Sequence, residues 1–232
     1  MRARAAPRCP RVLRTLTLAA PPSCPVRAHA RRPSLLPGPR SHRRPFFTQL
    51  YQRSLGANEG SDGKVPVIED GEFVMCESTP VAAYVDETRG GSRLAGASAQ
   101  DRAVLAIFAS SAGEGVMKAF YPFLMAQTDE AREKGKAGFD TALGAMSDAL
   151  RARGGPFVLG ATPSLADTGV WPFYARAMVL LPHYRGWALP TGERFEPLQR
   201  WASAMGELPY VKSTAVAPSV WIEGYAHYAN PK

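Results

Sequence analysis

The sequence predicts a small α/β domain followed by an all-helical domain. Two short apolar runs flank Asp70-Gly71, a dipeptide that favours a hairpin turn, and apolar residues at helical spacing follow over 79–87. Beyond Gly90-Gly91 the apolar residues recur only at helical spacing, which places a domain boundary near residues 88–97. A chain of 232 residues is long enough for two domains of ordinary size.

The predicted α/β domain contains a strand, a helix, a hairpin and a second helix. Residues 12–18 alternate apolar and polar side chains, which favours a short strand, and residues 46–55 have the pattern of a short amphipathic helix. The hairpin strands are expected at 65–68 and 72–76, before the helix at 79–87.

Capping patterns mark the start of two helices in the second domain. Ser98, with Asp101 three residues later, begins a helix that extends to about Gln127, and Ser164 begins another over 165–181. A further helix is expected over 195–208. The apolar stripe of the helix between the two capped ones consists of Phe139, Leu143, Met146 and Leu150.

The net charge of +8 comes entirely from the N-terminal quarter of the chain. The first 58 residues hold twelve Arg and no acidic residue, whereas the remainder holds 20 acidic residues against 16 basic ones. The folded body is therefore mildly acidic. Because the Arg residues are not interleaved with aromatic residues, the sequence does not favour nucleic-acid binding. No stretch approaches the roughly 18 consecutive apolar residues of a membrane span, so none is expected.

The Arg-rich N-terminus has two interpretations besides an ordered half-domain. Its composition is typical of an organelle transit peptide, and it would also arise if a gene model read through GC-rich non-coding sequence. We expect residues 1–11 to be a disordered leader. The short lead before Val12 favours a cytoplasmic location, with a plastid or mitochondrion as the alternative.

The three cysteines are too few for a disulfide framework, which points to a reducing compartment and to free thiols. Cys76 lies inside an apolar strand and is expected in the core. Cys24-Pro25 follows the 12–18 strand and is the candidate nucleophile, with Cys9-Pro10 as a rival. The four histidines show no metal-ligand spacing, so no metal is expected.

A strand, a Cys-Pro, a hairpin with Val-Pro at its start and a Glu-Ser that opens a helix form the layout of a thioredoxin-like thiol domain. Residues 63–71 (GKVPVIEDG), with Glu77-Ser78 and 84–87 (YVDE), resemble the glutathione-binding core of the soluble glutathione transferases. The resemblance covers about residues 60–228. It implies a thioredoxin-like N-terminal domain over 12–90, of which 12–58 is atypical, followed by a helical-bundle C-terminal domain over 96–228.

Within the helical half, the resemblance is most specific to the omega class of this superfamily. Residues 163–167 (PSLAD) match the capping box of the superfamily, and 171–176 (WPFYAR) and 201–205 (WASAM) resemble the omega class. The omega resemblance implies glutathione-dependent thiol transfer, with mixed disulfides or dehydroascorbate as substrates. The alternatives are an enzyme that conjugates glutathione to electrophiles and a non-catalytic glutathione- or ligand-binding protein.

The resemblance implies a glutathione site around the hairpin. The Val65-Pro66 peptide would be cis, so that the Val65 backbone pairs with the cysteinyl part of glutathione as an added strand. Ser78 and the amides at the start of its helix would bind the γ-glutamyl carboxylate, and Glu77 would bind the ammonium group. Lys64 would contact the tripeptide as well. Alternatively, the proline marks a strand edge and Glu77-Ser78 an ordinary helix start.

The resemblance also supports Cys24 as the nucleophile, because Cys24 lies 41 residues before Val65, close to the omega-class spacing. A thiol at a helix N-terminus has its pKa lowered from about 8.5 to roughly 3.5–7.5. Residue 27 is Arg, so there is no Cys-x-x-Cys pair, and Cys24 would form a mixed disulfide with glutathione. The alternative is an incidental thiol in a disordered leader, since three prolines between 33 and 39 interrupt the helix expected after it.

A pocket for the second substrate is implied in the helical half. Phe173 and Arg176 stand where the omega class lines its hydrophobic site, and Trp221 with Tyr228 reproduces the C-terminal Trp and Tyr of that class. The alternative is that these aromatic residues pack as core. The expected partners are glutathione as co-substrate and a small electrophilic or disulfide substrate. A homodimer with a second copy of the chain is compatible with the sequence.

Overall fold

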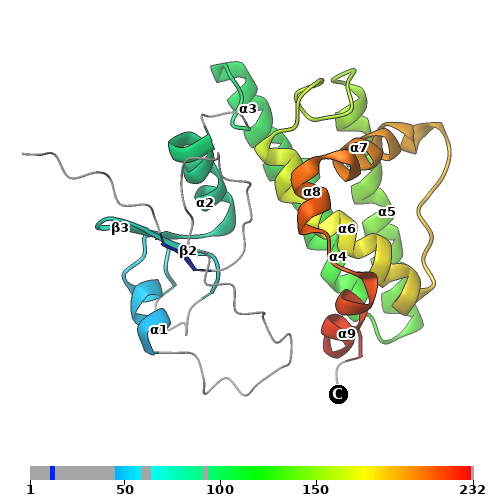
Figure 1. Cartoon of the computed structure of the whole chain (residues 1–232). Helices are drawn as coiled ribbons and strands as arrows, with labels where there is room; N and C mark the ends of the chain where they lie inside the picture. Colours follow the sequence, from blue (N-terminus) through cyan, green and yellow to red (C-terminus); the bar gives the residue numbers. More distant parts are fainter. Residues whose placement is uncertain (1–10, 14–44, 59–63, 91–93, 231–232) are drawn as a thin grey trace, which may run out of the picture. The chain divides into compact units, whose positions relative to one another are not determined.

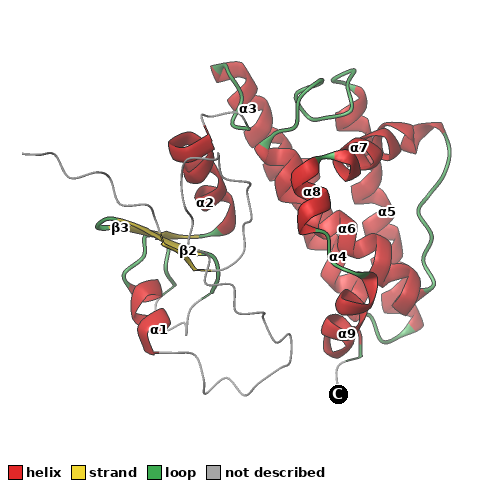
Figure 2. Cartoon of the chain, viewed as in Figure 1, coloured by secondary structure: helices red, strands yellow, loops and turns green. Residues whose placement is uncertain are grey.

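The structure, a computed structural model, describes residues 11–13, 45–58, 64–90 and 94–230. The chain divides into two compact units, Met1–Ser92 and Arg93–Lys232. The first unit contains every strand of the described residues, and the second is helical (Figure 2). Each unit has its own hydrophobic core, as expected for two domains.

The sheet of the first unit consists of β1 (Arg11–Leu13), β2 (Val67–Asp70) and β3 (Phe73–Cys76). The strands lie in the order β1-β2-β3 and are antiparallel. The turn between β2 and β3 includes Gly71 with φ of 65°, so the predicted hairpin is confirmed. Its first strand lies at Val67–Asp70, two residues later than the 65–68 expected. The strand predicted at 12–18 begins one residue earlier, at Arg11, which the expected leader of residues 1–11 had included. Residues 1–10 and 14–18 lie outside the described residues.

Helix α1 (Pro45–Gln52) and helix α2 (Ser78–Val85) cover opposite faces of this sheet (Figure 1). Neighbouring residues of a strand point to opposite faces. Val67 of β2 packs with Leu50 and Tyr51 of α1, whereas Ile68 packs with Val81 of α2. Each of these buried apolar side chains contributes about 1.5–3 kcal/mol. The alternation along β2 thus fixes the three-layer arrangement.

The end of α1 differs from the sequence-based expectation. The helix was expected to reach residue 55 but ends at Gln52, because the backbone of Leu55 pairs with the free edge of β3. The Leu55 amide donates to the Val74 carbonyl at 2.8 Å, and the Cys76 amide donates to the Leu55 carbonyl at 3.1 Å. Pairing with a sheet edge that is distant in the chain, at Met75, therefore overrides the helical pattern at Leu55.

The second unit is helical, as predicted, and its helices pack on one another. They are α3 (Ala99–Phe108), α4 (Glu114–Met125), α5 (Asp129–Arg151), α6 (Leu165–Arg185), α7 (Glu196–Glu207), α8 (Pro209–Thr214) and α9 (Pro218–Ala229). The predicted helix from Ser98 to about Gln127 is present as α3 and α4, joined through a π-helical turn. The capping boxes at Ser98 and Ser164 are both formed.

Helix α6 continues beyond its predicted end at Leu181. It passes through Pro182 and ends at Arg185, where Gly186 adopts φ of 61°. The prediction was wrong because it relied on the tendency of proline to end helices. Leu180 and Leu181 are completely buried, and packing of this turn against the core outweighs the local effect of the proline.

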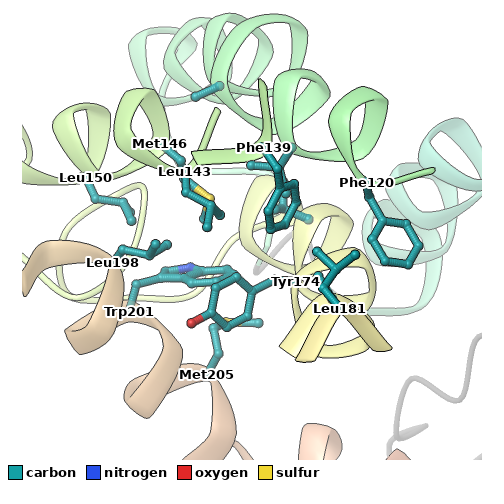
Figure 3. Packing of buried hydrophobic residues seen from close by; sticks show 14 of the residues in the cluster. Phe120, Phe139, Leu143, Met146, Leu150, Tyr174, Leu181, Leu198, Trp201 and Met205 are labelled. Atoms are coloured by element: carbon teal, nitrogen blue, oxygen red, sulfur yellow. The ribbon is translucent and has the colours of Figure 1, made fainter. Parts of the chain in front are cut away.

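The core of the second unit lies between α5, α6 and α7 (Figure 3). All four members of the predicted stripe on α5, from Phe139 to Leu150, are buried. Leu198, Trp201 and Met205 of α7 pack opposite them. The apolar residues of α5 recur at helical spacing because one face of this helix packs against the apolar side chains of α7.

Asp167 is a buried carboxylate at the start of α6. It accepts hydrogen bonds from the Ser164 amide (2.8 Å) and hydroxyl (2.5 Å), from the Val158 amide (3.1 Å) and from the Trp201 indole (2.8 Å). Burial raises the pKa of Asp167, although each of these hydrogen bonds acts in the opposite direction. The capping box therefore also connects α6 to α7 and to the loop before α6.

Candidate functional site

The hairpin brings the predicted glutathione-site residues of the first unit together. Val67 is paired with Cys76, so the residues before β2 and those after β3 lie at the same end of the hairpin. The Val65-Pro66 peptide is cis, as predicted. Val65 is 57% exposed, and Lys64, Glu77 and Ser78 are exposed as well. Predicted residues that are 10 or more positions apart in the chain thus line one exposed end of the sheet.

Glu77 has an unusual backbone conformation, with φ of 77° and ψ of 123°. Among the described residues it is the one non-glycine residue with a positive φ. Such a conformation costs about 1–3 kcal/mol and is concentrated at functional sites. It turns the chain from β3 into α2, where the Glu77 carbonyl accepts the Val81 amide at 3.0 Å. Neither sequence motif nor spacing predicted this strain.

The start of α2 can bind an anion. Its N-cap residue, Glu77, makes no side-chain hydrogen bond to the helix, so no side chain of the cap satisfies the first amides. These amides, at the positive end of the helix dipole, lie beside the Ser78 hydroxyl. No backbone hydrogen bond joins Val65 to another described residue, so its amide and carbonyl are available to an extended peptide.

The thiols fall into two groups. Cys9 and Cys24 lie outside the described residues. Cys76 is 3% exposed and packs with the core between the sheet and α1, as predicted. Its Sγ lies 3.6 Å from the Leu55 carbonyl oxygen. The described part of the first unit therefore contains no accessible thiol.

Phe173 and Arg176 of α6 are in contact, as a pocket lining requires. The Arg176 guanidinium lies 4.8 Å from the centre of the Phe173 ring, within the range of a cation–π interaction. It also donates to the Tyr225 hydroxyl of α9 at 2.6 Å and to the Pro172 carbonyl at 2.6 Å. One cation thus connects the aromatic face of α6 to the C-terminal helix.

Tyr228 belongs to the same group of contacting side chains as Arg176, Phe173 and Tyr225, which we call the aromatic cluster. Trp221 forms no aromatic ring pair with Tyr228. The Tyr228 ring lies 5.5 Å from Tyr225 and 5.8 Å from Tyr121 of α4, and the side chain is 40% exposed. Trp221 is partly buried and packs against the core of the helical unit. The prediction that it packs as core therefore fits Trp221 better than the pocket prediction does.

Sequence reasoning missed Tyr121 and Tyr225. Tyr225 lies four residues after Trp221 and three before Tyr228, so helical spacing alone could have placed it on the same face. No local signal marks Tyr121, which reaches the cluster from a different helix. Burial and a hydrogen bond with Tyr225 raise the pKa of Tyr121 to about 12, so it is a neutral hydrogen-bonding group at physiological pH.

Two cavities of the described residues lie elsewhere. One of about 490 Å³ is bounded by the start of α5 and the end of α6, and its lining includes Arg132, Lys136 and Arg185. Another of about 350 Å³ lies between α4 and α5, where small residues such as Gly135 and Gly138 line it. None of the predicted site residues lines either cavity. The pocket prediction for α6 and α9 therefore depends on the aromatic cluster itself.

The described residues contain no metal-binding cluster, and one helical stretch matches a membrane span in length and composition alone. No group of three or more His, Cys, Asp or Glu side chains in this part of the chain could hold a metal ion. The helical stretch Ala99–Met125 is long and apolar enough, by length and composition alone, to cross a membrane. One such stretch is weak evidence of a membrane span, because a core helix of a helical bundle can have the same length and composition.

The cis-proline hairpin and the helical bundle define a thioredoxin-like protein with an added helical domain. The model of the glutathione S-transferase N-terminal domain matches residues 48–93, and that of the C-terminal domain matches residues 129–204. The two matches together cover more than half of the chain. The chain belongs to the soluble glutathione transferase superfamily, a superfamily of glutathione-dependent enzymes.

Solved structures share this fold at low identity. A trimeric glutathione transferase of Leishmania is 24% identical, with a TM-score of 0.65 over 80% of this chain, which spans 39% of that protein. An Omega 3C glutathione transferase of Trametes versicolor is 24% identical, with a TM-score of 0.61, over 72% of this chain and 70% of that one. A dehydroascorbate reductase of Chlamydomonas reinhardtii is 21% identical, with a TM-score of 0.58, over 78% and 87%. A tau-class enzyme of mango has a TM-score of 0.64, so the fold does not single out one class.

Proposed function

We propose that the protein is a glutathione-dependent thiol transferase of the omega type, which reduces mixed disulfides or dehydroascorbate. The observation that carries the proposal is the exposed hairpin end, where Val65-Pro66 and Glu77-Ser78 lie together. The backbone there offers an edge for an extended peptide, and the start of α2 offers a site for a carboxylate. Glutathione is a peptide with a free carboxylate, so it matches both features. It also has an ammonium group that can pair with the Glu77 carboxylate.

Each residue of this end has a distinct role in the proposed complex. The Val65 amide and carbonyl pair with the cysteinyl unit of glutathione, and Lys64 contacts a carboxylate of the tripeptide. Ser78 and the first amides of α2 bind the γ-glutamyl carboxylate, while Glu77 binds the ammonium group. This arrangement would present the glutathione sulfur for reaction with a second group.

The proposed chemistry uses the Cys24 thiolate as the nucleophile. The thiolate attacks the glutathionyl sulfur of a mixed disulfide, so a Cys24–glutathione disulfide forms and the substrate leaves as its thiolate, which takes a proton from solvent. The thiolate of a second glutathione then attacks the same glutathionyl sulfur. Glutathione disulfide leaves, and the Cys24 thiolate is regenerated. For a substrate that carries one glutathionyl group, one glutathione is consumed and one glutathione disulfide is released. Reduction of one dehydroascorbate to ascorbate consumes two glutathiones, which leave together as one glutathione disulfide.

The structural neighbours support this type of reaction. One is described as an Omega glutathione transferase and another as a dehydroascorbate reductase. Omega-like motifs in this chain, 171–176 and 201–205, point in the same direction.

Conjugation of glutathione to electrophiles, or binding without catalysis, is the second candidate. The observation that favours it is that Cys76 is buried and that the N-terminal family match begins at residue 48, after both Cys9 and Cys24. In a conjugating enzyme the thiolate of glutathione itself attacks the substrate, and no protein thiol is needed.

Replacement of Cys24 by alanine separates these candidates. We expect Cys24→Ala to abolish glutathione-dependent reduction of a glutathionylated peptide and to leave glutathione binding intact, since the hairpin end supplies the affinity. Mass spectrometry of the unmodified protein should find one glutathione on Cys24, and Cys9→Ala serves as the matched control. Full reductase activity in Cys24→Ala would refute the proposed mechanism. Conjugation alone in both proteins would favour the second candidate, and binding without turnover would favour a binding protein.

A further inference from the structure

The C-terminal helix α9 buries little apolar surface. Ala229 is its one fully buried residue, while Trp221, Ile222 and Tyr225 pack against the core only in part. Apolar burial is the main force that holds a helix on a protein, so a helix with a small buried face depends on other contacts. The position of α9 is therefore sensitive to its polar contacts with α4 and α6.

Arg185, at the end of α6, makes the most extensive of these contacts. Its guanidinium donates to the Ala229 carbonyl of α9 at 2.5 Å and to the Phe123 carbonyl of α4 at 3.3 Å, and it also donates to the Leu124 carbonyl. A further bond reaches the Tyr184 carbonyl at 2.8 Å. One side chain thus connects the final turns of three helices.

Electrostatics explains why an arginine occupies this position. The last carbonyls of a helix have no partner within the helix and carry about half a negative charge in total. Three such ends, at Met125, Arg185 and Ala229, converge here. Burial and the neighbouring Arg132 lower the pKa of Arg185, but a guanidinium remains protonated in proteins. Its planar fork of five donors bonds four carbonyls here, more than the three donors of a lysine could.

Gln127, in the α4–α5 loop, provides a second bond to the same point. Its side-chain amide donates to the Ala229 carbonyl at 2.8 Å and to the Met125 carbonyl at 2.9 Å. We refer to Arg185 and Gln127 together as the C-terminal clasp. Ala229 directly follows Tyr228 and lies one helical turn after Tyr225, so the clasp acts next to the aromatic cluster.

We propose that the C-terminal clasp holds α9, and with it Tyr225 and Tyr228, in position for an aromatic second substrate. Arg185 and Gln127 are positioning residues in this proposal, because they act on the pocket through the backbone of α9. The proposal rests on the proposed function for the identity of the pocket. The attachment of α9 by the clasp does not depend on the proposed function, because it rests on the hydrogen bonds alone.

Two measurements test the proposal on the full chain. Hydrogen exchange followed by mass spectrometry reports the opening of residues 218–229, with α5 as an internal reference. Calorimetry gives the dissociation constant of glutathione, and a fluorescence titration gives that of 8-anilinonaphthalene-1-sulfonate, an aromatic probe that carries no glutathione. The variants are Arg185→Lys, which keeps the charge, and the milder Gln127→Ala, which changes an exposed side chain. Arg132→Lys is the control. Arg132 lines the same cavity as Arg185, but its guanidinium forms an ion pair with Asp129.

In Arg185→Lys we expect exchange of 218–229 to become at least about tenfold faster while α5 is unchanged. Affinity for the aromatic probe should fall about fivefold or more, the lower end of typical coupling between sites, with the dissociation constant of glutathione unchanged. Gln127→Ala should show the same changes to a smaller extent, and Arg132→Lys should show neither.

Unchanged exchange in both variants would overturn the clasp. Faster exchange with an unchanged affinity for the aromatic probe, or no binding of this probe by the unmodified protein, would overturn the role of the clasp in the pocket. An equal loss of affinity for both ligands would also overturn it, because that result indicates general destabilisation. If the unmodified protein binds neither ligand, the proposed function fails, and the exchange measurement still decides whether α9 is held by the clasp.

Discussion

Replacement of Asp167 by asparagine tests how much the buried capping box contributes to stability. One carboxylate oxygen accepts the Val158 amide and the Trp201 indole, and the other accepts the amide and hydroxyl of Ser164. Asparagine keeps one acceptor oxygen and places an NH₂ group at the other position. The hydroxyl of Ser164 can then accept a hydrogen bond from this NH₂ group, but the backbone amide of Ser164 is left buried without an acceptor. An unsatisfied buried donor costs about 1–3 kcal/mol, so we expect Asp167→Asn to lower the free energy of unfolding by this amount.

Thermal and urea unfolding, followed by circular dichroism, measure this loss. For a chain of this size 1 kcal/mol corresponds to about 2–4 °C, so Tm should fall by about 2–12 °C. Asp101→Asn is the matched control, because Asp101 forms the same capping box with Ser98 at the exposed start of α3. Its effect should be clearly smaller. Equal effects of the two substitutions, or no effect of Asp167→Asn, would refute the argument that burial makes this box important.

The same substitution tests the direction of the Asp167 pKa shift. Burial raises the pKa of Asp167 above its ordinary value, so the folded state favours the protonated carboxyl. This contribution to stability is complete below about pH 3.9, the pKa in the unfolded chain, and is lost as the pH rises through the folded pKa. Asparagine does not titrate. The deficit of Asp167→Asn relative to the unmodified protein should therefore be larger in acid than at neutral pH, and a smaller deficit in acid would contradict the shift.

Two further predictions concern the glutathione site and α5. Ser78→Ala and Glu77→Ala should each weaken glutathione binding by about 1.5–3 kcal/mol in calorimetry, whereas Glu77→Gly should weaken binding equally but unfold at a higher denaturant concentration than Glu77→Ala, since glycine tolerates the positive φ. Equal stability of these two Glu77 variants would argue against backbone strain. On α5, Gly135→Ala should destabilise the fold because its Cβ would lie 2.8 Å from Cα of Phe123, whereas Gly138→Ala, with nothing within 4 Å, should stabilise it by about 1 kcal/mol. Denaturant midpoints that move in the same direction would contradict this contrast.

Local patterns in the sequence were sufficient for much of the fold. The hairpin around Gly71, the apolar stripe from Phe139 to Leu150 and the capping boxes at Ser98 and Ser164 each depend on residues close together in the chain. Turn geometry, helical periodicity and N-capping act over this short range, so the sequence reveals them directly.

Long-range contacts decided where these local rules fail. Leu55 leaves the predicted helix because its backbone pairs with the edge of β3, and α6 passes through Pro182 because Leu180 and Leu181 are buried in the core. Neither the sheet edge nor the depth of the core can be read from nearby residues. Tertiary packing therefore outweighed propensity at both positions.

The candidate sites show the same division. The resemblance of the sequence to the glutathione transferases implied the cis Val65-Pro66 peptide and the residues at the hairpin end, and the hairpin that brings these residues together is a local feature. Only the tertiary structure decided the strained backbone of Glu77, the arrival of Tyr121 from another helix and the convergence of three helix ends on Arg185. The physical reason is that partial charges and rings from distant segments become neighbours only after the helices pack, and their interactions have no counterpart in sequence spacing.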